Sequence, residues 1–165
     1  MPANMTSVRL QILQAIESFF TNMTATDPTD DPFGITWSTV EIGPLAKPDQ
    51  RKRFSLGIVP GLEKEWFEMP FINSKMIVNI EFRVTVNAGD PAPGVMIEQA
   101  LTVVKRGMTT DRSWGGLAID TKVVNSEVDL ITYADRSAVG VCVAEIQFRY
   151  GFADPRTQQG AYGAY

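Results

Sequence analysis

The sequence predicts an α+β fold, in which a mostly antiparallel sheet carries two helices packed on one of its faces. Apolar residues recur at helical spacing in residues 5–23 and 95–108, whereas apolar and polar residues alternate in residues 75–86 and 137–152. The elements follow the order helix, several strands, helix and two strands. Because strands and helices do not alternate regularly, this order favours α+β over α/β.

The first helix is predicted at residues 5–23, with Thr6 or Ser7 as its N-cap. Its apolar face comprises Val8, Ile12, Ala15, Ile16, Phe19, Phe20 and Met23. The second helix is predicted at residues 95–108. Gly107 stands near its end and is interpreted as a helix stop.

Five strands are predicted, at residues 35–42, 53–59, 75–86, 117–133 and 137–152. The last two are expected to form an antiparallel pair. Residues 60–75 place aromatic side chains between charged ones and are interpreted as a loop. We expect a single domain over residues 1–150. Residues 151–165 are rich in Gly, Ala, Gln and Tyr without periodicity, so we expect a flexible C-terminal tail.

Composition excludes several classes of function. The 165 residues include no histidine and one cysteine, Cys142, which excludes Ser-His-Asp and Cys-His catalytic arrangements and the usual zinc sites. The net charge of −4 argues against a surface dedicated to nucleic acid, which normally has excess Lys and Arg. No signal peptide and no apolar stretch of ~20 residues is present, so we expect no membrane association.

No motif in the sequence indicates catalysis. The sequence has no P-loop, dinucleotide fingerprint, HExxH or GxSxG motif. Asp27, Asp30 and Asp31 lack the spacing of a calcium loop, and Glu127 with Asp129 is typical of solvated carboxylates on a strand. We therefore expect no enzyme activity, no cofactor and no metal site.

Aromatic residues between the periodic segments are the candidate functional residues. Trp66, Phe67, Phe71 and Trp114 either cap the ends of the sheet or anchor an interface. The stretch TTDRSWGGLAIDTKVV, residues 109–124, contains Trp114, for which both interpretations are open. We expect its glycines to adopt positive φ in a turn that presents Trp114 outward, against the competing interpretation that the indole caps the core. The candidate interface residues are Trp66, Phe67, Phe71, Asp111, Arg112, Trp114, Gly115 and Gly116.

The order of elements, together with DRSWGGLAIDTKVV after a helix and AEIQFRYGF in the last strand, resembles the tail terminator and tail-completion proteins of long-tailed bacteriophages. The features that carry the resemblance span residues 5–150. They are the N-terminal helix, the VPGLE turn at 59–63, the helix at 95–108, Asp111 with Gly115–Leu117, and the pair Arg149-Tyr150.

The resemblance implies a structural virion protein that caps the tail tube as a homo-hexameric ring and joins it to the head connector. Its partners would be copies of itself, the tail tube protein and the head-tail connector protein. Genome DNA would pass through the lumen without specific binding. The location implied is the tail or neck of the virion, after assembly in the host bacterial cytoplasm. The alternatives are another phage neck or connector component, or a monomeric ligand- or peptide-binding module.

Overall fold

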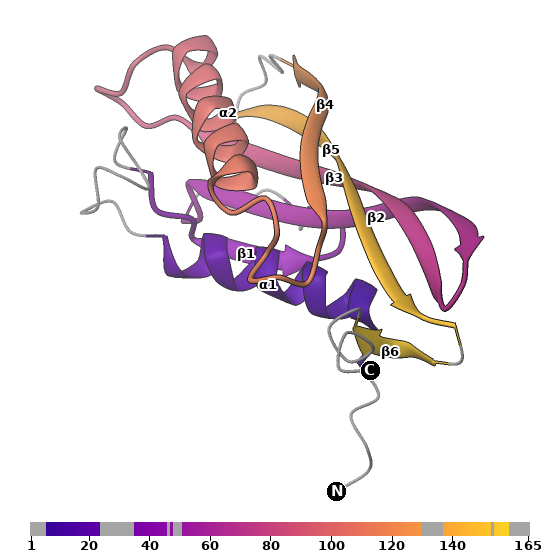
Figure 1. Cartoon of the computed structure of the whole chain (residues 1–165). Coiled ribbons are helices and arrows are strands. Elements are labelled where there is room, and N and C mark those ends of the chain that lie inside the picture. Colours follow the sequence, from indigo (N-terminus) through magenta and orange to yellow (C-terminus); the bar gives the residue numbers. More distant parts are fainter. Residues whose placement is uncertain are drawn as a thin grey trace, which may run out of the picture.

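The computed structural model describes residues 6–23, 35–45, 47, 51–129, 137–152 and 154–158. Their elements are α1 (Val8–Asn22), β1 (Thr39–Ile42), β2 (Phe54–Glu68), β3 (Phe71–Thr85), α2 (Pro93–Thr110), β4 (Asp120–Asp129), β5 (Ser137–Gly151) and β6 (Asp154–Gln158). The sheet order is β1-β2-β3-β5-β4, and β6 pairs with β5 (Figure 1). The pairs are antiparallel apart from β1 with β2, which is parallel.

Both helices lie on one face of this sheet (Figure 1). Helix α1 packs over β1 and β2, while α2 packs over β3, β4 and β5. The buried hydrophobic side chains form one continuous cluster between the helices and the sheet. The predicted α+β fold is therefore confirmed.

The faces of the two central strands follow the predicted alternation. On β3, Val78, Ile80 and Phe82 are fully buried, whereas their sequence neighbours are only half-buried. On β5 the buried side chains likewise alternate, at Cys142, Ala144, Ile146 and Phe148. One face of each strand thus forms the floor of the core beneath the helices.

Helix α1 begins where its sequence predicts. Ser7 is the N-cap, and its Oγ accepts a hydrogen bond of 3.1 Å from the backbone N–H of Leu10. Val8, Ile12, Ile16 and Phe20 recur every fourth residue and are fully buried. This stripe holds α1 on the sheet.

The interpretation of Gly107 as a helix stop is wrong. Helix α2 continues to Thr110, and Gly107 lies where α2 crosses α1. A Cβ atom at this position would lie 2.7 Å from two ring carbons of Phe20 and 3.0 Å from a ring carbon of Phe19. The residue is glycine because the two helices approach too closely for a side chain.

The loop predicted at residues 60–75 is also wrong. These residues form the outer half of a long β2–β3 hairpin, in which Trp66 pairs with Asn73 and Glu68 pairs with Phe71. A register shift between Pro60 and Glu63 accommodates the proline within the ladder. This half of the hairpin extends past the helices, so both of its faces are partly exposed and its sequence shows no clean alternation.

Two further expectations change at the ends of the sheet. The strand expected at 35–42 is shorter, at Thr39–Ile42, and pairs with Ser55–Ile58.

The flexible tail expected from residue 151 is wrong for residues 154–158, which form β6. The Arg156 backbone N–H and Nε both donate to Asp154 Oδ1 at 2.9 Å, within this strand. Residues 159–165 lie outside the described part of the chain.

We expect Gly107→Ala to lower the free energy of unfolding by about 1–3 kcal/mol, because the added methyl group forces Phe19 and Phe20 out of their packed positions. Urea denaturation followed by far-UV circular dichroism measures the change. Thr102→Ala, at an exposed position on the same helix, is the control and should change stability by less than about 0.5 kcal/mol. Equal stability of the two variants would contradict the close approach of the helices.

Candidate functional site

The structure divides the eight candidate interface residues between two places. Trp66, Phe67 and Phe71 lie together at the tip of the β2–β3 hairpin. The other five, from Asp111 to Gly116, lie in the turn between α2 and β4. This separation was not predictable from the sequence, because it depends on how far the hairpin extends from the core.

Asp111 organises the turn after α2. Its carboxylate accepts hydrogen bonds from the Ser113 backbone N–H at 3.0 Å, from Ser113 Oγ at 2.8 Å and from the Gly115 backbone N–H at 2.8 Å. These bonds, that of the Ser113 hydroxyl first, lower the pKa of Asp111 below its usual value. Gly115 and Gly116 adopt φ values of 72° and 88°, which confirms the predicted positive-φ turn.

Trp114 does not point outward as expected. Its side chain is only 5% exposed, and its ring packs edge-on against Phe19 at a centroid distance of 6.1 Å. The indole Nε1 donates to Thr121 Oγ1 at 2.9 Å, and that hydroxyl donates to the Arg112 carbonyl at 2.8 Å. Because this bond satisfies its one polar atom, the indole can be buried, and Trp114 caps the core.

Arg112 remains on the surface of the same turn. Its Nη2 lies 2.7 Å from Asp120 Oδ1, in an ion pair that joins the turn to the start of β4. The guanidinium is largely exposed, so water screens this pair and it contributes little stability. Of the turn residues, Asp111, Arg112, Gly115 and Gly116 are exposed and Trp114 is buried.

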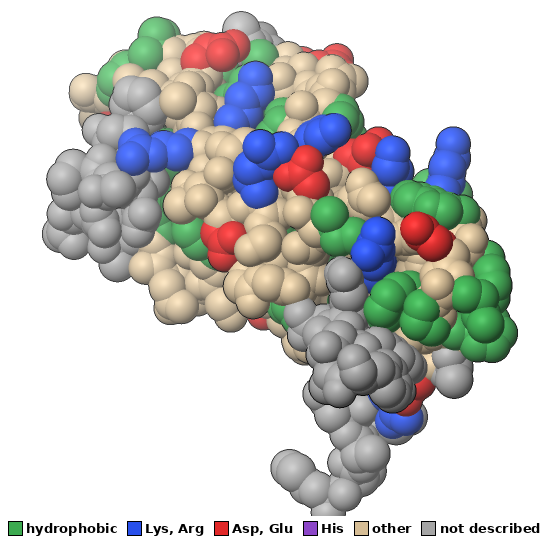
Figure 2. Space-filling view, in the orientation of Figure 1, with side chains coloured by type: hydrophobic (Ala, Val, Ile, Leu, Met, Phe, Trp, Pro, Cys, Tyr) green, Lys and Arg blue, Asp and Glu red, His purple; other side chains and the backbone are tan. Residues whose placement is uncertain are grey.

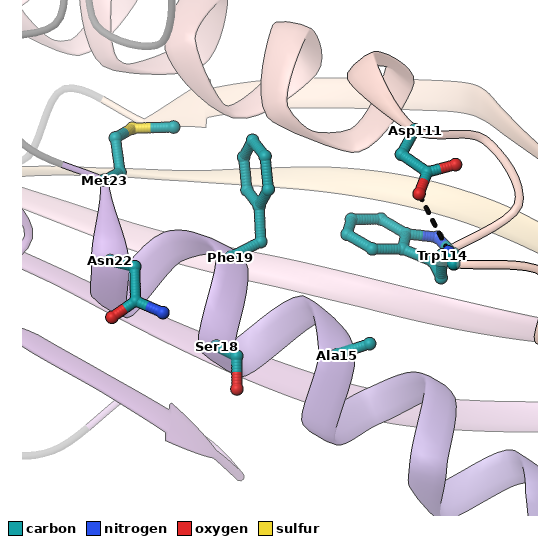
Figure 3. A pocket seen from close by; sticks show the side chains of 8 residues that line it. Ala15, Ser18, Phe19, Asn22, Met23, Asp111 and Trp114 are labelled. Carbon is teal, nitrogen blue, oxygen red and sulfur yellow. Dashed lines mark hydrogen bonds between the residues drawn. The ribbon is translucent and has the colours of Figure 1, made fainter.

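A groove lies between α1 and this turn (Figure 3). It has a volume of about 450 Å³ and is lined by Ala15, Ser18, Phe19, Asn22, Met23, Asp111, Trp114 and Gly115. Phe19 and Trp114 form apolar walls, and Ser18 and Asn22 project from α1 at the edge. We call this the α1 groove. The α1 contribution was not predicted, because Phe19 was assigned only to the core-facing side of the helix.

The fully exposed residues of α1 are uncharged, and its two charged residues, Arg9 and Glu17, are half-buried. Its exposed residues are Leu10, Gln14, Ser18, Thr21 and Asn22. A solvated helix normally has charged side chains on its outer face, whereas the centres of protein interfaces are depleted of them. The uncharged exposed residues reach the α1 groove at Ser18 and Asn22.

The tip of the β2–β3 hairpin gathers exposed apolar side chains. Trp66 is 39% exposed, Phe67 57%, Met69 72% and Phe152 57%. Phe67 and Phe152 stack edge-to-face at a centroid distance of 5.0 Å, which joins the tip to the end of β5. In Figure 2 the hydrophobic side chains gather over this tip. We call these four residues the tip patch; Met69 and Phe152 were not among the predicted residues.

Two aromatic residues near the tip, Trp66 of the tip patch and Phe71, make cation–π contacts. Lys75 Nζ lies 5.9 Å from the ring centre of Trp66, and the Arg149 guanidinium lies 5.9 Å from that of Phe71. Phe71 is only half-buried at this position. Trp66 and Phe71 thus carry charged neighbours, and the tip patch extends from Trp66 towards Phe67, Met69 and Phe152.

Polar contacts of Glu63 and Glu65 on β2 connect the hairpin to α1 and to β5. Arg9 Nη1 lies 2.9 Å from Glu63 Oε2, and Ser74 Oγ donates to Glu63 Oε1 at 2.5 Å. Two residues further along β2, Glu65 Oε1 accepts a hydrogen bond of 2.6 Å from the Tyr150 hydroxyl. Burial, together with this hydrogen bond, raises the pKa of Tyr150, so the phenol stays protonated. These contacts set the direction in which the hairpin leaves the core.

The cysteine and the carboxylates of β4 lie apart from these two surfaces. Burial raises the pKa of the Cys142 thiol to about 11, which keeps it protonated. Glu127 and Asp129 line an open groove on the opposite face of the sheet with Glu81 and Arg83. Among the described residues, no cluster of three His, Cys, Asp or Glu side chains is placed to hold a metal ion. Neither described helix has the length and apolar character that a bilayer crossing requires.

No protein-family model matches the chain, and no curated protein matches it. The candidate functional site therefore consists of the two surfaces that the structure itself shows, the tip patch and the α1 groove.

Because Trp114 is buried, we expect Trp114→Ala to lower the free energy of unfolding by about 3–5 kcal/mol, the cost of a large cavity beside Phe19. Urea denaturation of the subunit measures it. Phe67→Ala removes an aromatic ring of the exposed tip and should cost less than about 1 kcal/mol. If the two variants were equally stable, the core-cap assignment would be wrong.

We expect Asp111→Asn to lower the free energy of unfolding by about 1 kcal/mol at pH 7, because it replaces the charged acceptor of the hydrogen bonds from Ser113 and Gly115. The effect stays small because the carboxylate is exposed and water screens its charge. The folded pKa of Asp111 is lowered, so its contribution is fully present above the unfolded value near 3.8 and is lost as pH falls through the folded pKa. The difference in unfolding midpoint between wild type and variant should therefore be full at about pH 6 and shrink below about pH 3.8. A difference that grew on acidification would contradict this sign.

Proposed function

We propose that this protein is a phage tail terminator, a structural virion protein that caps the tail tube as a hexameric ring and joins it to the head connector. The proposal starts from the resemblance of residues 5–150 to tail terminator and tail-completion proteins. The observation that carries it further is that one small α+β subunit has two separate contact surfaces, the tip patch and the α1 groove.

Two different surfaces on one subunit suit ring assembly. A ring of identical subunits uses heterologous contacts, in which one patch meets a different patch on the next copy. An exposed apolar hairpin tip makes a free subunit prone to aggregation, whereas in an assembly the same surface is buried against a partner. The partners in this proposal are other copies of the chain, the tail tube protein and the head-tail connector protein.

The net negative charge of the protein is compatible with DNA passing through the lumen of a ring. The net charge of −4 gives no general attraction for phosphate, so DNA could pass through a ring lumen without being held. The protein would then lie in the tail or neck of the virion, and no catalytic residue, cofactor or metal enters its role. Another neck or connector component would use the same surfaces and remains the alternative within the virion.

The α1 groove favours one further candidate function. Its volume of about 450 Å³ lies within the range of small-ligand pockets, and Phe19 and Trp114 give it apolar walls. A monomeric module that binds a ligand or peptide would use this groove and leave the tip patch unexplained. The terminator proposal accounts for both surfaces and is preferred for that reason.

The proposal is tested with the tail tube protein encoded in the same genome. We expect the purified chain to bind the ends of preformed tubes, to stop their elongation, and to appear there as a ring of about six 18.2 kDa subunits. Electron microscopy of tube lengths and ends, with light scattering of the detached ring, measures this. A chain that leaves tube length unchanged and never occupies a tube end is not a terminator. A ring found only at the head vertex would identify a connector component instead.

A further inference from the structure

The tip patch is large for a surface that stays in water. Aromatic and similar side chains present roughly 150–250 Å² each, so at these exposures the four residues leave on the order of 400 Å² of apolar surface. A stable interface buries about 800 Å² per partner. Two tips packed against each other would therefore bury too little. The tip needs a partner surface that also covers its flanks.

The α1 groove has the size and chemistry to receive the tip. An apolar cavity of about 150 Å³ holds one benzene molecule. At about 450 Å³, the groove has room for two aromatic rings. The uncharged exposed residues of α1 continue from its edge, beside the half-buried Glu17, and offer contact area for the flanks of a seated hairpin.

The tip cannot fill the groove of its own chain. Arg9, near the start of α1, contacts Glu63 on the hairpin, so the hairpin leaves the core at this end of the helix. Phe19 and Asn22 line the groove near the opposite end. The ten residues from Arg9 to Phe19 span about 15 Å of helix, and the outer hairpin extends past the first end. Contact between tip and groove is therefore intermolecular.

The geometry points to a second copy of this chain as the occupant: Phe67, Met69 and Phe152 of one subunit seat in the α1 groove of the next. This contact rests on the proposed function, because it supplies the heterologous contact of the ring. Each subunit has one tip and one groove in different places, so a tip that seats in the next copy in turn builds a ring or a chain. Two copies that exchange tips reciprocally would instead close a two-fold dimer. Wild type should therefore sediment as a species larger than a dimer, and a closed wild-type dimer would overturn the ring contact. Trp114 then acts as a fixed wall of the receiving groove.

The first test uses two complementary variants. Phe67→Ser with Phe152→Ser removes the tip, and Ser18→Lys with Asn22→Lys places charges at the groove edge. All four positions are exposed, so unfolding midpoints should stay near that of wild type. Each variant alone should remain monomeric, with a dissociation constant raised about 30-fold or more. Thr102→Lys, on the exposed side of α2, is the control and should assemble like wild type.

Mixing the two variants gives the sharper result. The tip variant keeps an intact groove and the groove variant keeps an intact tip, so an equimolar mixture can form one contact only. We expect a dimer and nothing larger in sedimentation velocity. Larger assemblies in the mixture, or no association while wild type assembles, would overturn the tip-in-groove contact.

The second test joins the two surfaces covalently. Met69→Cys in one variant and Ser18→Cys in another should form an intermolecular disulfide only when the variants are mixed under mild oxidation. Cys142, the one native cysteine of the chain, is buried and serves as an internal negative control. Dimers of Met69→Cys alone would show tip-to-tip contact. Failure to cross-link in both free and tube-bound protein would overturn the inference.

The two proposals fail in different ways. If the tip variant still forms the wild-type ring at tube ends, the contact is wrong and the terminator function stands. If wild type assembles through tip and groove but ignores tail tubes, the contact stands and the terminator function is wrong. If wild type stays monomeric and also ignores tubes, both are overturned.

Discussion

The structure depends on the close approach of α1 and α2 at Gly107, where a side chain of any size would meet the rings of Phe19 and Phe20. From this crossing a series of edge-to-face contacts runs through the helix layer. Trp114 packs on Phe19, Phe19 on Phe20, Phe20 on Trp37, and Trp37 on Phe54 at the start of β2. Both helices, the turn after α2 and the sheet are thereby fixed relative to one another, since close-packed aromatic rings leave little freedom to shift.

Helix α1 carries this constraint to both candidate surfaces. Near its N-terminus, Arg9 holds Glu63 and so orients the projecting hairpin. Near its C-terminus, Phe19 faces Trp114 and forms the walls of the α1 groove. Tip and groove are therefore separated by a rigid helix, and their relative direction is set by the fold. In a ring, that direction would decide the rotation between neighbouring subunits.

What the sequence predicted well was the periodicity of buried elements. The stripe of α1, the alternation of β3 and β5 and the α+β class follow from burial on one face, which the pattern of apolar residues records. It failed where a residue's role depends on a distant segment. Gly107 resembled a helix stop, yet this position needs glycine because the rings of Phe19 and Phe20, some ninety residues earlier in the chain, leave no room for a side chain. The 60–75 hairpin was missed because its residues show no alternation of burial: residues 64–70 are all exposed, and the neighbouring Asn73 and Ser74 are both buried.

Trp114 shows why an aromatic residue beside glycines is ambiguous in sequence. The positive φ of Gly115 and Gly116 was predictable from residue type, but the side chain of the preceding residue, Trp114, can point either out of such a turn or into the core. Thr121, seven residues later, decides it by accepting the indole N–H, which removes the cost of burying that polar atom. The buried indole still lines the groove, so we interpret Trp114 as part of a fixed wall and not as a mobile anchor. A preformed wall loses less conformational entropy on binding than an exposed anchor that must be ordered. The turn thus contributes to recognition through the shape it gives the groove, while the exposed, adaptable apolar side chains belong to the hairpin tip.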